Sequence, residues 1–198
     1  MPRLESVDMD GRIHPILKLL RAPRVKSITV RRCQLNDNDA TTTLLAFLGD
    51  AEFAPTDVHH LELLNFHHQP RSTMDDGRVE RLILTLRRLE SLRSLSIGVG
   101  SGQCNPTMSF APGASLVNRI REEGLLPNLT DLTVNNGCKD GHPHHFDIHN
   151  SVREIVESRA SSCIVNGRNV VALQRVETDF DVSPEARDTV AVGDGCTA

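Results

Sequence analysis

The sequence predicts an α/β fold in which a parallel sheet of about six short strands carries helices on one side only, as in a curved solenoid. Three observations predict this fold. A short apolar motif recurs along the chain, segments with helical periodicity separate its copies, and polar residues alternate with the apolar ones inside each copy. Strands that alternate with helices form parallel sheets through right-handed crossovers.

The recurring motif consists of three apolar residues, with two residues between the first and second and one residue between the second and third. Each copy covers only a few residues rich in Val, Ile and Leu, which suits a short strand. A fixed kind of motif repeated along a chain is typical of solenoids. The copies are Leu4-Val7-Met9, Val25-Ile28-Val30, Val58-Leu61-Leu63, Leu92-Leu95-Ile97, Leu129-Leu132-Val134 and a weaker copy, Leu173-Val176-Thr178.

Between these copies the apolar residues recur every three or four residues, which is typical of one face of a helix. In the first such segment, Ile13, Ile16, Leu17 and Leu20 share a face. In the last segment, Asn150-Ser151 is predicted to begin the helix, with Glu154 completing a capping box. Helices are therefore expected around residues 13–20, 44–48, 79–89, 116–124 and 152–156.

The polar residues inside the motif decide between two parallel-sheet architectures. In a doubly wound sheet the strands are buried on both faces and are nearly continuous apolar runs. Here polar residues such as Ser27, Thr29, Glu62 and Ser96 stand between the apolar ones. One face of the sheet should therefore be in contact with water, as the concave face of a solenoid is.

Four sequence segments extend the pattern beyond the strands: PRLESV at residues 2–7, ILKLLRAP at 16–23, LPNLTDL at 126–132 and IVESR at 155–159. Because of these segments the chain resembles a leucine-rich repeat protein of the long-repeat, ribonuclease-inhibitor-like kind. More narrowly, it resembles the repeat region of fungal F-box-type proteins. The resemblance implies a leucine-rich repeat domain over residues 1–180. The remaining tail, 181–198, is small and polar and has no helical face long enough to pack, so we expect it to be disordered.

The resemblance also implies a function in protein–protein interaction. A partner protein would bind the concave sheet face and the adjacent loops. In F-box-type proteins that partner is a substrate destined for ubiquitination. No F-box is visible before the first predicted strand, so ubiquitin-ligase components would be engaged indirectly, through a separate F-box protein or segment.

The candidate binding surface follows from the alternation of side chains along each strand. Acidic residues lie toward its two ends and small hydroxyl residues lie between, so a partner peptide with basic groups at its edges would suit it. Its predicted members are Ser27, Thr29, Arg31, His60, Glu62, Leu64, Ser94, Ser96, Asp131, Thr133, Asn135, Arg175, Glu177 and Asp179, preceded by Ser6 and Asp8.

A zinc-binding or metal-dependent protein is the alternative. Cysteine and histidine are zinc ligands, and His145 and His149 have the spacing of neighbours on a helix. A tetrahedral ligand set does not follow from a His-rich segment alone, so no cofactor is expected. The candidate ligands are Cys138, His142, His144, His145 and His149.

Composition narrows the class of protein further. Lys and Arg number 22 against 26 Asp and Glu, a net charge of −4, which argues against nucleic acid as a partner. No apolar run approaches the length of a membrane span, so no membrane partner is expected. Five scattered cysteines and an N-terminus without an apolar stretch predict an intracellular protein, cytoplasmic or nuclear. No catalytic constellation is visible, so we predict a non-enzymatic recognition module.

Overall fold

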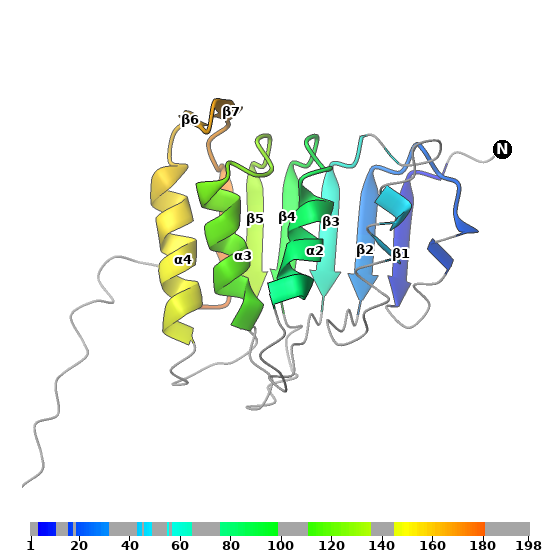
Figure 1. Ribbon diagram of the computed structural model, residues 1–198, viewed down its shortest axis with the longest axis horizontal. Coiled ribbons are helices and arrows are strands. Elements are labelled where there is room, and N and C mark those ends of the chain that lie inside the picture. Colours follow the sequence, from blue (N-terminus) through cyan, green and yellow to red (C-terminus); the bar gives the residue numbers. More distant parts are fainter. Residues whose placement is uncertain are drawn as a thin grey trace, which may run out of the picture.

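Six parallel strands form the sheet in the computed structural model of this chain, in the order β1-β2-β3-β4-β5-β8 (Figure 1). They are β1 (Ser6–Asp10), β2 (Ser27–Arg31), β3 (His60–Leu64), β4 (Ser94–Gly98), β5 (Asp131–Asn135) and β8 (Arg175–Thr178). The predicted α/β class with a six-stranded parallel sheet is confirmed.

The structure describes residues 4–10, 16–17, 19–31, 43–44, 46–48, 55, 57–64, 76–98, 111–135 and 145–180, with the backbone alone at 76–79, 81, 111–113 and 145–147. The predicted tail, 181–198, lies outside these residues.

The apolar motif sets the register of the sheet. Its middle residue occupies the same level in every strand, and neighbours such as Ile28, Leu61 and Leu95 are direct cross-strand partners. All three are buried beneath the sheet with exposed fractions of at most 1%. Because side chains alternate along a strand, this shared register turns every intervening polar residue to the opposite face.

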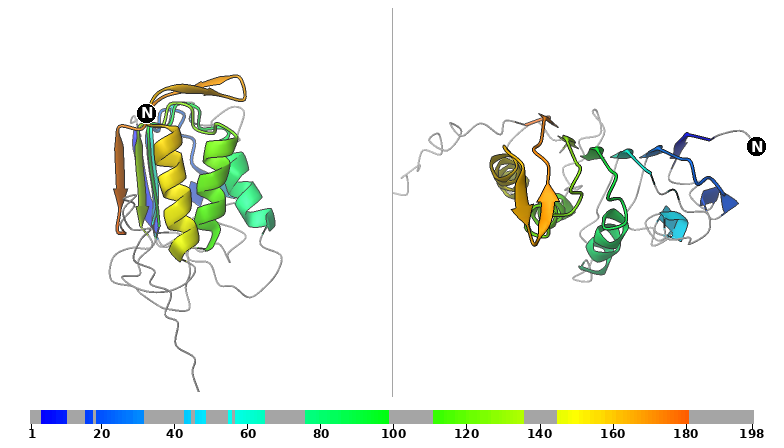
Figure 2. Two further views of the ribbon diagram at one scale, coloured as in Figure 1. Left: turned by 90° about the vertical axis from the view of Figure 1, so that its left-hand side faces the viewer. Right: turned by 90° about the horizontal axis from the view of Figure 1, so that it is seen from above.

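Helices α2 (Asp76–Leu86), α3 (Ala111–Glu122) and α4 (His145–Ser158) lie on one side of the sheet. Seen from above, the strands follow a shallow arc and these helices lie along its outer side (Figure 2). Apolar residues of the helices, such as Ile83, Val117 and Ile155, are fully buried against the sheet. No helix in the described part of the chain covers the other face of the sheet.

The first predicted helix differs from expectation. Residues 16, 17 and 19 form a 3₁₀ turn, and residues 11–15 and 18 lie outside the described part of the chain. Leu17 is 1% exposed, whereas Ile16, which was predicted on the same apolar face, is 52% exposed. A 3₁₀ turn has three residues per turn, so Leu17 and Leu20 share the inner side and Ile16 lies outside.

The predicted start of the last helix is wrong. Helix α4 begins at His145, one and a half turns before the expected cap, so Asn150 and Ser151 lie inside it. The buried face extends toward the N-terminus through Ile148, which lies four residues before Val152. The stabilisation from packing this additional turn against the sheet exceeds the local preference of Asn150 and Ser151 for the first position of a helix.

A short antiparallel hairpin was not predicted. It consists of β6 (Cys163–Val165) and β7 (Arg168–Val170). Between them, Asn166 and Gly167 both have positive φ values, 49° and 76°. Asn-Gly is the preferred pair for such a two-residue turn, because both residues tolerate the left-handed region. The sequence therefore carried a signal for this hairpin.

Ion pairs connect the outer surfaces of the helices. Glu123, just after α3, accepts hydrogen bonds from Arg119 and from Arg87 Nη2, the latter at 2.7 Å. Arg119 also donates to Glu80 Oε1 of α2 at 2.5 Å. The hydrogen bond from Arg87, assisted by Arg119, lowers the pKa of Glu123 below its ordinary value of 4.5, against a smaller opposing effect of burial.

We expect Glu123→Gln to lower the melting temperature by about 3 °C at pH 7, the effect of roughly 1 kcal/mol in a chain of this size. The folded-state pKa of Glu123 is depressed, so its stabilisation is complete above about pH 4.5 and is lost as the pH falls through the folded-state pKa. Thermal melts at pH 7 and pH 3 should therefore differ in the size of the loss. Glu157→Gln, an exposed carboxylate 3.9 Å from Arg153, is the control and should change little. An equal loss at both pH values would contradict this prediction.

Candidate functional site: the polar face of the sheet

We call the side of the sheet opposite α2, α3 and α4 the polar face. The register arranges its side chains in rows across the strands. One row is Ser6, Ser27, His60, Ser94, Asp131 and Arg175. The next row is Asp8, Thr29, Glu62, Ser96, Thr133 and Glu177. Residues far apart in the sequence therefore form one continuous polar surface.

The charges at the two ends of the polar face are paired. Arg31 binds Asp8 through two hydrogen bonds, Nε to Oδ1 at 3.0 Å and Nη2 to Oδ2 at 2.8 Å. This carboxylate raises the pKa of the Arg31 guanidinium. At the other end Arg175 pairs with Glu177 on the same strand. Both end carboxylates are therefore neutralised within the chain.

The centre of the polar face carries two carboxylates without a cation partner in the described chain. Glu62 on β3 accepts a hydrogen bond from Thr29 Oγ1 at 3.1 Å, and Asp131 on β5 accepts one from Thr130 Oγ1 at 2.6 Å. Neither forms an ion pair within the described residues. Arg31 lies close enough to Glu62 for an electrostatic interaction, and Arg175 is the cross-strand neighbour of Asp131, but both arginines hydrogen-bond to other carboxylates. The central carboxylates are therefore the ones of this face without a direct ion pair in the described chain.

Strand β4 lies between these carboxylates and carries small residues on the polar face: Ser94, Ser96 and Gly98. His60 shares a hydrogen bond with Ser94, Nδ1 to Oγ at 3.0 Å. Gly98 has a φ of +144°, and a Cβ there would overlap the backbone carbonyl of Asn135. Glycine is therefore required where β4 ends against β5.

All fourteen residues predicted on the binding face are described in the structure. Thr29 and Ser96 are buried among their neighbours, while Arg31, Arg175, Glu177 and Asp179 are exposed and the other eight are half-buried. Asp179 follows the end of β8. Their role in binding stays a prediction.

Most of the predicted metal candidates lie outside the described part of the chain: Cys138, His142, His144 and the side chain of His145. His149 is described, within α4, and its ring stacks on Phe180 with a centroid distance of 4.0 Å and an interplanar angle of 8°. Among the described residues, no group of three or more His, Cys, Asp or Glu side chains is placed to hold a metal ion.

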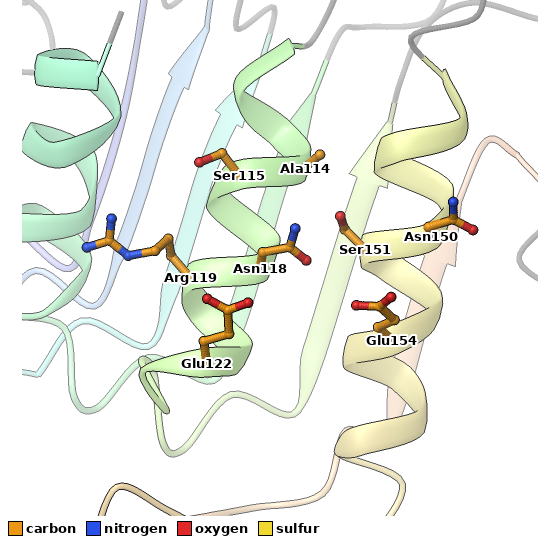
Figure 3. Close-up of a pocket in the computed structure, with 8 residues that line it drawn as sticks. All are labelled: Ala114, Ser115, Asn118, Arg119, Glu122, Asn150, Ser151 and Glu154. Atoms are coloured by element: carbon orange, nitrogen blue, oxygen red, sulfur yellow. The ribbon is translucent and has the colours of Figure 1, made fainter.

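A groove of about 580 Å³ on the helical side was not predicted from the sequence (Figure 3). Asn118 and Glu122 of α3 face Ser151 and Glu154 of α4 across it. Arg121 pairs with both Glu122 and Glu154. The carboxylates of the groove are thus already paired with Arg121, and its Arg119 is paired with Glu80 and Glu123. The polar lining of the groove also differs from the mainly apolar lining of small-molecule sites. The polar face is therefore the stronger candidate.

The fold and the polar face define an α/β protein with a six-stranded parallel sheet, helices on one side and a polar surface on the other. No family model, curated protein or solved structure matches the chain. No helix among the described residues combines the length and apolar character needed to cross a membrane.

Proposed function

We propose that this chain is a non-enzymatic protein-recognition module of the leucine-rich repeat kind, and that a partner protein binds its polar face. The observation that carries the proposal is the open, six-stranded polar surface, built in rows from residues of every strand of the sheet. In solenoid proteins, the face of the sheet that no helix covers is typically the surface that contacts a partner. By this proposal the polar face is the concave face of a short arc.

The repeat arrangement is supported by the order of the strands. From β1 to β5, strands that follow one another in the sequence are neighbours in the sheet, all parallel and in the register set by the motif. The role in ubiquitin ligation rests on the resemblance to F-box-type proteins alone. In that role the partner would be a substrate, and the adaptor contact would come from elsewhere.

Site-specific photo-crosslinking tests the recognition surface. A benzophenone amino acid placed at Ser27 or Asn135 reports on the polar face, and one placed at Glu157, on the outer surface of α4, is the matched control. We expect crosslinks to a distinct protein in an extract of the native cells from the first two positions and not from the third. Co-recovery of a cullin and its adaptor would extend the function to ubiquitin ligation.

Two results would contradict the proposed function. One is a folded chain that gives no crosslink from either position on the polar face. The other is an equal pattern of crosslinks from the polar face and from Glu157, which indicates nonspecific contact. A circular dichroism spectrum of each labelled chain shows whether it is folded.

A further inference from the structure

The distribution of charge on the polar face indicates what kind of segment it binds. The end carboxylates, Asp8 and Glu177, are occupied by Arg31 and Arg175. The central ones, Glu62 and Asp131, receive hydrogen bonds only from the hydroxyls of Thr29 and Thr130 among the described residues. Arg31 and Arg175, the nearest cations of the face, direct their hydrogen bonds to Asp8 and Glu177. Neither forms an ion pair with Glu62 or Asp131 among the described residues, so a cationic group of a partner could pair with both.

The small residues of β4 make room between these two carboxylates. Neighbouring strands lie about 4.8 Å apart, so β3 and β5 are separated by about 10 Å across β4. Longer side chains stand on both sides: His60 and Glu62 on β3, Asp131 and Asn135 on β5. An extended peptide laid along β4 fits this width.

Ser96 provides a second, independent observation. Its side chain lies on the polar face between Glu62 and Thr133 in the register, because its neighbours Leu95 and Ile97 point into the core. It is only 9% exposed, and its hydroxyl forms no hydrogen bond in the described chain. A hydroxyl on a nearly buried residue, without a partner in the described chain, is available to form a hydrogen bond with a ligand.

We propose that the partner presents an extended segment with a Lys or Arg residue, which lies along β4 with its cation between Glu62 and Asp131 and its polar groups reaching Ser96. This inference rests on the proposed function and names the chemistry of the partner. Hydrogen bonds between a cation and a carboxylate are stronger than neutral ones, so these two residues would select for basic segments. The basic group is thereby placed at the centre of the face and not at its edges, where the sequence had placed it.

Selection from a random dodecapeptide library on phage, with the full chain as the target, tests this inference. The selected peptides are synthesised and their affinities measured by fluorescence anisotropy, and amide chemical shifts of the chain show where each peptide binds. We expect enrichment of Lys and Arg, shifts in β3, β4 and β5, and about a tenfold loss of affinity in the double variant Glu62→Gln, Asp131→Asn. The matched control, Glu90→Gln with Glu157→Gln, removes the same charge outside the polar face and should stay within twofold.

The outcomes separate this inference from the function on which it rests. Peptides that shift β3–β5 without enrichment of basic residues, or that bind the double variant equally well, would overturn the inference and leave the recognition surface in place. A library that returns no binder, or binders that shift only residues outside the polar face, would overturn both. An equal loss of affinity in the double variant and the control would show a general charge effect and would also overturn the inference.

Discussion

Leu61→Asp is expected to leave the chain unfolded at 25 °C. Leu61 is 0% exposed and sits in the middle of the sheet, between Ile28 of β2 and Leu95 of β4. A carboxylate at this position would be buried without a partner, at a cost of about 5 kcal/mol or more, which is comparable to the whole stability of a domain. Far-UV circular dichroism of the purified variant measures the outcome.

The adjacent substitution is the control for this prediction. Glu62→Lys changes the next residue of β3, which lies on the polar face and is half-buried. We expect it to keep the fold and to cost about 1 kcal/mol or less, because it loses one hydrogen bond from Thr29. If Glu62→Lys unfolds the chain and Leu61→Asp does not, the two faces of the strand have been assigned in reverse.

Arg159→Ala should destabilise the chain by about 3 kcal/mol. Arg159 follows α4 and is 2% exposed. Its guanidinium donates to three backbone carbonyls: Nη2 to Leu126 at 3.1 Å and to Leu129 at 3.4 Å, and Nε to Val171 at 3.3 Å. These bonds tie the segment before β5 and the segment before β8 to the end of α4. Alanine would leave three carbonyls without this donor and a cavity beside them.

Burial lowers the pKa of Arg159 to about 10, so the group is still charged at neutral pH. Among the described residues no carboxylate forms an ion pair with it. We expect Arg159→Lys to recover little of the loss, because one ammonium group cannot reproduce the planar fork that reaches three carbonyls. Urea unfolding measures each variant. Arg168→Ala, at an exposed arginine of β7, is the matched control and should stay within about 0.5 kcal/mol. Equal midpoints for Arg159→Ala and Arg168→Ala would contradict the structural role.

The segment IVESR at residues 155–159 is part of the family resemblance, but the sequence does not show what its residues do. The structure shows this. Ile155 is fully buried against the sheet, and Arg159 closes the end of the helix with its hydrogen bonds to the backbone. The Asn166-Gly167 turn is the opposite case. Its signal was local and complete in the sequence, but the strands it joins are only three residues long.

For the candidate site, too, one part could be predicted from the sequence and another part could not. Alternation along each strand was enough to say which residues share the polar face, because the period of a strand is two. It could not say which charges on that face are already paired. Arg31 and Asp8 are 23 residues apart, and Thr29 and Glu62 are 33 apart, so only the register between strands reveals their contacts.

The sequence by itself determined the class of fold, the number of strands in the parallel sheet and the apolar side of each of them, because these depend on local periodicity and on the order of elements. The tertiary structure alone decided where α4 begins, which side of the 3₁₀ turn is buried, and where negative charge stays unneutralised. These features depend on packing and on contacts between distant residues. For this reason the sequence suggested a partner with basic groups at the edges of the polar face, whereas we propose, from the pairing of charges in the structure, a basic group at its centre, between Glu62 and Asp131.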